Sequence, residues 1–469
     1  MTHSLPWGFR WRSNAGFVLA TVALGLFTDL FLYGIIVPVL PFLLHDRLGV
    51  PDDRIQLHAS MMLAVYAGTS VVFSFPAGWV TDRIGSRRRP FLAGLMLLLA
   101  ATGLLAFGRT VGVLAVARAM QGVSAAIVWT AGLAMVQDVV GPKNIGQAIG
   151  MISSVISVGE LIAPVLGGVL YGRAGMSAVS AVSIGILAID LVMRLLVIDP
   201  KSISSHDGSG LCHFPPEDSY PTMPGQHSSA AREGDPLIPR PVSEEYKIHT
   251  TLSSMEQAIP ILYCFRNPRF LTAMLLVSVQ SLLVGVFDAT VPTETEKLFH
   301  FSSLKVGLLF AAIVIPNLAL GPVAGLAVDR YGTKVVATAG YAFLVPCFVL
   351  LGLPSQEILT GDRNVILFCV ILALNGIGLS TIASPGLVEA SHVTERYESA
   401  NPGFFGENGP YAQLYGLSSV FAFAGLAVGP LVSGMLRESV GYSVMAGVFA
   451  VVAGITAVVS FVGIGEKRR

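Results

Sequence analysis

The stretch GWVTDRIG (residues 78–85) recurs as GLAVDRYG (residues 325–332), and each copy directly follows a long apolar run. A second pair of apolar runs shares five residues at one constant offset, and these are Gly150, Ser153, Gly159, Pro164 and Gly168, matched by Gly416, Ser419, Gly425, Pro430 and Gly434. Both matches join corresponding runs in two parts of the chain. The sequence therefore predicts a duplicated six-helix unit, the parallel-repeat organisation found in transporters.

The composition is typical of a protein that lies in a lipid bilayer. Charged residues make up 12% of the 469 residues and hydrophobic residues 53%, whereas soluble domains carry roughly 25% charge. The formal net charge is zero, so no basic field indicates a nucleic-acid partner. Cys212, Cys264, Cys347 and Cys369 are scattered without a CxxC pair, which argues against a disulfide framework or a metal site. We expect no cofactor.

Twelve segments are long and apolar enough to cross a bilayer, which takes about 20 residues. They begin near Phe17, Leu57, Pro90, Val111, Ile145, Met176, Phe270, Leu304, Val335, Asn364, Tyr411 and Val440. The first run is too long for a cleavable signal peptide, and we expect no lipidation. Lipid offers backbone groups no partner, so the spans are expected to be helices. The predicted fold class is an all-α integral membrane protein with twelve helices in two six-helix halves.

The predicted domains are an N-terminal six-helix bundle over residues 1–198 and a C-terminal bundle over residues 269–469. Between them, residues 199–268 are rich in Ser, Pro, His and charge, which is typical of a mostly disordered linker. A short amphipathic helix is expected around residues 253–265. If the N-terminus is cytosolic, about 20 of the 29 Lys and Arg residues face the cytosol and about 8 the other side. Both termini and the linker are then cytosolic.

Three motifs resemble the major facilitator superfamily. The GxxxDRxG loop with the three arginines at residues 87–89 resembles that family's loop between spans 2 and 3. RAMQG at residues 118–122 resembles its span 4 motif, and GELIAPVLGG at residues 159–168 resembles its span 5 antiporter motif, with Ala163 where Gly is usual. The resemblance covers the chain outside the linker and implies secondary transport by two rocking halves.

The chain is more closely similar to the vesicular monoamine transporter branch of the drug:proton antiporters. The similarity rests on Asp29 ahead of Pro38 and Pro41, on DATVP at residues 288–292 and on LVEASHV at residues 387–393. That branch has Lys in span 2 and Asp in span 11, where this chain has Tyr66 and Ser419, and residues 395–410 are inserted. The acid sites of spans 1, 7 and 10 are retained. In its overall character the sequence also resembles fungal efflux carriers.

Ionisable groups inside spans are costly and usually functional, and they define a candidate cavity for protons and cargo: Asp29, Tyr66, Arg118, Glu160, Asp288 and Glu389. Asp29 lies roughly 18 Å into span 1, and the alternative role is capping a kink near Pro38. Arg118 either couples transport or is a structural tether. Glu160 is either a proton site or the partner of Arg118, and Glu389 is either a site residue or solvated.

Other side chains support narrower expectations. Four aromatic side chains could contact an organic cation or simply pack against neighbouring helices, and these are Tyr33, Tyr66, Trp129 and Phe287. Asp190 and Arg194, four residues apart, are expected to form an ion pair on one helix.

The repeated loop is the candidate gate, with the residues Gly78, Asp82, Arg83, Gly85, Arg87, Arg88, Asp329 and Arg330. An acid there can face a helix N-terminus or an arginine and lock one conformation, and the family likeness favours Asp82 over Asp329. The alternative is a basic loop that only fixes topology. Proline and small residues are expected to bend spans 5 and 11 and to pack them closely as the interface between halves, and these are Gly159, Pro164, Gly168, Gly425 and Pro430.

These observations lead to one function and two alternatives. We expect a proton-coupled antiporter, not an enzyme, that exports small amphipathic organic molecules such as drugs, toxins or secondary metabolites. The alternatives are a proton symporter or uniporter for a nutrient, and a non-transporting sensor. The expected partners are the substrate, protons and the bilayer, with the chain as a monomer. The plasma membrane is expected, with vacuolar, vesicular or peroxisomal membranes as alternatives.

Overall fold

The computed structural model describes residues 9–12, 14–84, 86–197, 246–248, 253–299, 303–356, 361–406 and 408–465, and nearly all of these are helical. The first part of the chain forms α1 (Phe9–Arg12), α2 (Ala15–Ile36), α3 (Leu40–Phe42), η1 (Leu43–Arg47), α4 (Asp52–Ile84), α5 (Arg88–Phe107), α6 (Val111–Val140), η2 (Pro142–Asn144) and α7 (Ile145–Leu196). The second part forms α9 (Ser254–Ala258), η5 (Pro260–Arg266), α10 (Pro268–Phe299), α11 (Ser303–Tyr331), α12 (Thr333–Leu351), η6 (Pro354–Gln356), α13 (Asp362–Ile382), α14 (Pro385–Ala400), α15 (Tyr411–Val440) and α16 (Tyr442–Gly463).

Within these described ranges, eleven helical stretches are long and apolar enough to cross a membrane. One of them holds α7, which is interrupted at Gly175, where φ is 69° and ψ is −165°. A left-handed φ costs glycine little because it has no Cβ. The two parts of α7 are separate spans, so the total is twelve and the predicted fold class is confirmed.

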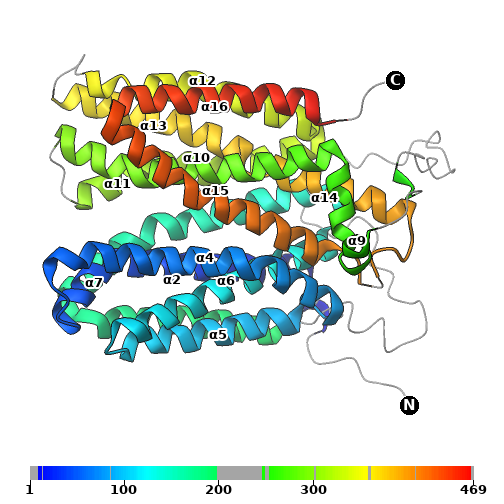
Figure 1. Cartoon of the computed structure of the whole chain (residues 1–469), viewed down its shortest axis with the longest axis horizontal. Coiled ribbons are helices and arrows are strands. Elements are labelled where there is room, and N and C mark those ends of the chain that lie inside the picture. The colour runs from blue at the N-terminus through cyan, green and yellow to red at the C-terminus, as the bar shows by residue number, and fades with distance from the viewer. Residues whose placement is uncertain are drawn as a thin grey trace.

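The helices group by their order in the chain. We call α2–α7 the N half and α10–α16 the C half, and Figure 1 shows the first, blue to cyan, below the second, green to red. The halves meet mainly where α4 packs on α15 and α7 packs on α11. The expected domain boundaries stay a prediction, because residues 198–245 and 249–252 of the expected linker lie outside the described residues.

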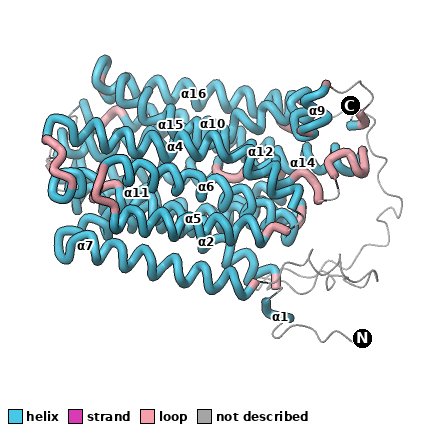
Figure 2. Tube along the Cα trace, turned by 60° about the horizontal axis from the view of Figure 1, so that its bottom comes forward, coloured by secondary structure: helices cyan, strands magenta, loops and turns pink. Residues whose placement is uncertain are grey.

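One end of the bundle collects the connecting segments. Figure 1 shows α9, α14 and the C-terminal end of α16 at the same end, and Figure 2 shows α1 there as well. We call this end the linker side. The helix expected around residues 253–265 is present as α9 followed by η5, and α9 starts with a capping box in which Ser253 and Glu256 bind each other's backbone N–H.

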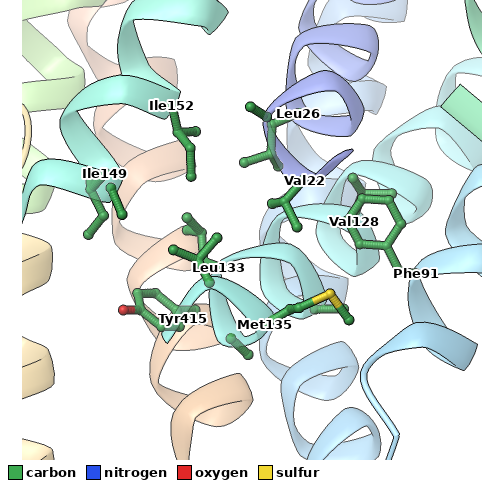
Figure 3. Close-up of a cluster of buried hydrophobic side chains, with 14 of the residues drawn as sticks. Val22, Leu26, Phe91, Val128, Leu133, Met135, Ile149, Ile152 and Tyr415 are labelled. Carbon is green, nitrogen blue, oxygen red and sulfur yellow. The ribbon is translucent and has the colours of Figure 1, made fainter. Parts of the chain in front are cut away.

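A large apolar cluster fills the N half between α2, α5, α6 and α7 (Figure 3). Val22, Leu26, Phe91 and Val128 lie on one side of it, and Tyr415 of the C half closes its edge. Lipid tails are as apolar as these side chains, so close van der Waals packing rather than water exclusion holds such helices together.

Glycines allow close approach between the halves, but they are not the ones expected next to Pro164 and Pro430 in spans 5 and 11. A Cβ on Gly150 would meet the backbone of Gly321, and one on Gly78 would meet the backbone of Ala412. Gly159, by contrast, packs on Phe27 of its own half.

The other expected interface residues also contact their own half: Pro164 lies against Gly34, Gly425 against Ser278 and Pro430 against Gly285. A Cβ added at Gly168 would meet nothing within 4 Å. The expected interface between spans 5 and 11 is therefore wrong. The first part of α7, which is span 5, packs on α11, and α15, which is span 11, packs on α4. The segments around Pro164 and Pro430 pack inside their own halves.

Candidate functional site

Asp29 occupies a buried polar site in the middle of α2. Its side chain is 1% exposed. One carboxylate oxygen, Oδ2, accepts hydrogen bonds from the Tyr66 hydroxyl at 3.3 Å and from the Trp129 indole N–H at 3.2 Å. The other oxygen, Oδ1, has no hydrogen-bond partner. Asp29 thus binds residues of α4 and α6 instead of capping a kink near Pro38.

Arg118 of α6 lies beside this acid without forming an ion pair with it. The guanidinium is fully buried and donates from Nη1 to Gln121 Oε1 at 2.8 Å, while Nε and Nη2 have no hydrogen-bond partner. Its Cζ lies 5.1 Å from the ring centroid of Tyr33 and 5.0 Å from that of Tyr66. A desolvated cation between two aromatic rings gains up to roughly 2 kcal/mol per contact, so the rings and Gln121 stabilise the cation.

A second pair of acids comes from opposite halves, Glu160 from α7 and Asp288 from α10. Both acids are solvent-exposed although they lie in the interior of membrane spans. They interact electrostatically with each other, and Asp288 also acts on Tyr33, which in turn is next to Arg118. Neither has Arg118 as an ion-pair partner, so the structure does not bear out the pairing of Glu160 with Arg118. Exposed acids in the middle of a membrane protein line a cavity or pathway.

An aromatic contact joins the two halves at the same place. Trp129 of α6 meets Phe423 of α15 edge-on, with ring centroids 6.4 Å apart, and Tyr33 and Tyr66 lie 4.7 Å apart. The predicted aromatic set therefore gathers at the site, except for Phe287. That side chain is 2% exposed and packs on Phe348 in the C-half core.

Glu389 does not belong to this group and is not solvated. It is 1% exposed and forms an ion pair with Arg269 of α10 at 2.7 Å. Thr333 donates a further hydrogen bond to its second oxygen at 2.5 Å. A carboxylate with both oxygens satisfied and its charge compensated is a structural anchor.

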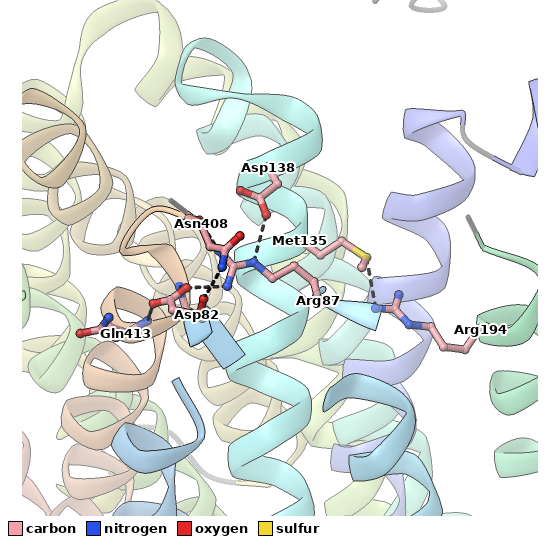
Figure 4. A network of polar contacts seen from close by, with 8 residues as sticks. Asp82, Arg87, Met135, Asp138, Arg194, Asn408 and Gln413 are labelled. Carbon is pink, nitrogen blue, oxygen red and sulfur yellow. Dashed lines mark hydrogen bonds and ion pairs between the residues drawn. The ribbon is translucent and has the colours of Figure 1, made fainter. Parts of the chain in front are cut away.

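Asp190 and Arg194 are both fully buried in the second part of α7. They interact electrostatically. Both oxygens of Asp190 nevertheless lack a hydrogen-bond partner, and Arg194 donates to Met135 Sδ at 3.1 Å and covers the Phe91 ring at 3.8 Å (Figure 4). The expected i,i+4 pair is therefore present as a buried electrostatic interaction, without a hydrogen bond between the two side chains.

Asp82 at the end of α4 joins the two halves on the linker side (Figure 4). Asp82 accepts hydrogen bonds from the backbone N–H groups of Ala412 and Gln413, at 3.2 and 2.8 Å, at the start of α15. Arg87 donates to Asp82 Oδ1 at 2.5 Å and to Asp138 at 3.0 Å. Burial lowers the pKa of the Arg87 guanidinium, but the two carboxylates outweigh that effect and raise it overall, so Arg87 stays charged.

The other gate candidates occupy several kinds of position. Asp329 repeats the Asp82 contact at the start of α7, where it accepts from Gly146 and Gln147 at 2.9 and 2.8 Å. Arg88 donates to the carbonyl of Leu195. Arg83 stacks on Trp79 at 3.7 Å and Arg330 lies over Tyr331 at 5.6 Å. Gly85 lies outside the described residues.

Sequence reasoning missed a second contact across the gate, made by Gln137 of α6. Its Oε1 accepts hydrogen bonds from Ser391 of α14 and from Tyr415 of α15, both at 2.9 Å. A polar amide near the end of an apolar span was the available signal, because a buried amide has to find partners. Gln121, which binds Arg118, carried the same signal inside RAMQG.

Comparisons with known proteins agree with this geometry. The sequence model of the Major Facilitator Superfamily matches residues 22–405 and 273–469. The chain is 54% identical to the MFS-type transporter ppzB of Metarhizium rileyi, over 99% of this chain and 98% of that one. It is 31% identical to a probable vesicular acetylcholine transporter of Danio rerio, over 39% of this chain and 38% of that one.

The fold also has a solved counterpart. The human organic anion transporter MFSD10 superposes with a TM-score of 0.68 at 16% identity, over 95% of this chain and 99% of that one. Two halves of membrane-spanning helices, a gate built on the repeated loop and the match of the family model lead to one conclusion: the chain belongs to the Major Facilitator Superfamily and is a multi-pass membrane transporter, not an enzyme.

Proposed function

We propose that the protein is a proton-coupled antiporter that exports small amphipathic organic molecules, with basic groups preferred in the cargo. The observation that carries the proposal is the placement of Glu160 and Asp288. They are exposed acids on opposite halves, inside membrane spans, next to the cluster of Asp29 and Arg118. Carboxyl groups without a counter-ion in such a place can bind and release protons.

The closed linker side supports a direction for the cycle. In this conformation the gate of Asp82 and Asp329 holds the linker-side ends of the halves together. The exposed acids would then be reached from the opposite side, and the excess of basic residues in the linker-side loops would make that opposite side non-cytosolic. Protons would enter from that side and cargo would leave there. Rocking of the halves would then open the linker side for new cargo.

The chemistry of the lining supports the preference for basic cargo. Asp29 acts electrostatically on the guanidinium of Arg118, and Asp288, which interacts with Glu160, acts on the neighbouring Tyr33. Tyr33, Tyr66 and Trp129 add aromatic faces, which attract organic cations. Cargo and protons would compete for the same carboxyl groups, and this competition would couple the two fluxes.

The test uses purified protein in proteoliposomes with ethidium as the cationic probe and pyranine as the internal pH reporter. With an acidic interior, ethidium should accumulate inside while the interior loses protons, and protein-free liposomes should do neither. Ethidium that moves in the same direction as the protons would indicate a symporter. Ethidium flux that ignores the pH gradient would contradict proton coupling.

A further inference from the structure

A short segment of the connection between the halves is bound by one amide side chain. Asn401, just after α14, accepts a hydrogen bond from the backbone N–H of Ile248 at 3.0 Å. It also donates from Nδ2 to the backbone carbonyl of Tyr246 at 2.8 Å. One side chain therefore satisfies a donor and an acceptor of a passing chain, which is how an amide recognises peptide backbone.

The side chain of Tyr246 is bound as specifically as its backbone. The residue is 4% exposed. Its ring packs edge-on against Tyr397, with centroids 5.1 Å apart, and its hydroxyl accepts a hydrogen bond from Arg269 Nη1 at 3.0 Å. Arg269 is the residue that pairs with Glu389. The phenol is thus joined to the C half by both packing and a charge-assisted hydrogen bond.

The following part of the connection extends this contact to the N half. Ile261 and Cys264 of η5 are fully buried in the same apolar cluster as Tyr246 and Tyr397. Phe75 of α4 packs on this cluster, and Trp79 of α4 donates to the carbonyl of Ala258 at 3.5 Å. The segment therefore bridges α14 of one half and α4 of the other.

The loop that carries Asn401 is also connected to the gate. Asn408, farther along the same loop, donates to the backbone carbonyl of Asp82 at 2.8 Å and accepts from Arg87 Nη2 at 3.1 Å. One end of the loop thus holds the connection and the other end holds the gate. Opening of the linker side separates α4 from α15, so it has to disturb both ends.

We propose that Tyr246–Ile248, together with α9 and η5, forms a self-docked latch that stabilises the closed linker side. The site on α14 and its following loop takes a tyrosine-bearing peptide, and the occupant is this chain's own connecting segment. Release of the segment would favour opening. The proposal concerns the equilibrium between conformations and goes beyond the identity of the cargo or the coupled ion.

The test measures the distance between the halves on the linker side. Spin labels are attached through an encoded keto amino acid at Ile84, at the end of α4, and at Val335, at the start of α12, which are 43% and 59% exposed. This labelling leaves the native cysteines unmodified. Distance distributions are recorded for the full chain in nanodiscs, without any substrate or pH gradient, so failed transport leaves the result interpretable.

Tyr246→Ala and Asn401→Ala should each raise the ratio of the long-distance to the short-distance population roughly fivefold, the factor that loss of about one net hydrogen bond produces. Met255→Ala is the matched control, because Met255 lies on α9 and is 68% exposed. Asn401→Ala keeps the Tyr246 side chain with its contacts to Tyr397 and Arg269, and it carries the test if Tyr246→Ala does not fold. Unchanged distributions in a folded Asn401→Ala protein would overturn the latch.

Discussion

Asp82 and Asp329 make the same contact at two places related by the internal duplication. Asp82 accepts from the first backbone N–H groups of α15, and Asp329 accepts from those of α7, each in the opposite half. A helix N-terminus carries about half a positive charge, so each carboxylate caps a helix that it does not belong to. Both loops therefore make a gate contact across the halves, and Asp82 also forms an ion pair with Arg87.

Neutralising either acid should weaken the closed linker side. In Asp82→Asn and Asp329→Asn an oxygen still accepts one hydrogen bond, but the charge at the helix N-terminus is lost, which costs roughly 1 kcal/mol. Asp82→Asn also removes a carboxylate partner of the buried Arg87, so it should have the larger effect. The two sites share no partner, so the double variant should show about the sum. Distances between labels at residues 84 and 335 measure the shift. Asp362→Asn, at an exposed position, is the control and should leave the distribution unchanged.

Gln137 should be a second closing contact, independent of the repeated loop. Tyr415→Phe and Ser391→Ala each remove one donor to Gln137 Oε1, and each should favour the open state by about 1 kcal/mol. Removing both leaves a buried acceptor without a partner, and that should cost more than the sum of the single changes. The same label pair measures all three variants. Simple additivity in the double variant would show that the two bonds act separately.

Asp29→Asn should separate proton coupling from folding. The amide oxygen can still accept from Tyr66 and Trp129, so the melting temperature should change little. The amide cannot release a proton in the physiological range, so pH-driven ethidium exchange should fall at least about tenfold, as expected for an intramembrane acid that carries the coupled proton. Asp46→Asn, whose exposed acid binds His45, is the matched control. Wild-type exchange in Asp29→Asn would remove Asp29 from the coupling mechanism.

The glycines of spans 5 and 11 should differ sharply in their tolerance of a side chain. A Cβ at Gly150 would strike the backbone of Gly321 across the interface between the halves, whereas one at Gly168 would meet nothing within 4 Å. Gly150→Ala should therefore push α7 from α11 and favour the open linker side, at a cost of about 1–3 kcal/mol for overpacking. Gly168→Ala should leave the label distances unchanged. Equal effects of the two substitutions would contradict the close packing.

The helices themselves could be predicted with good accuracy from the sequence. Ten of the predicted starts lie within two residues of a helix start in the structure, because the need to satisfy backbone groups in lipid acts on each segment by itself. The duplication was equally visible, since matched residues at a constant offset need no knowledge of packing. The acids that interrupt apolar runs were also visible one by one.

Which of those groups meet was decided only by the tertiary structure. Asp29 is joined to Tyr66 and Trp129 from two other helices, Glu160 faces Asp288 across the halves, and Glu389 is neutralised by Arg269 from α10. Hydropathy does not distinguish these acids from one another, because it scores the cost of a charge in lipid without knowing which group will pair with that charge. The partner is set by how helices rotate and cross, and that depends on packing along their whole length.

The repeated loop at residues 78–85 and 325–332 shows what the sequence determines and what the tertiary structure adds. By itself the sequence determined a duplicated set of twelve membrane helices and two acids at equivalent loop positions. Only the tertiary structure decided that each acid caps a helix of the opposite half, and that the connecting segment binds α10 and the end of α14 through Tyr246. The physical reason is range: membrane insertion is a local property of a segment, whereas a hydrogen bond between distant residues exists only once the halves are packed.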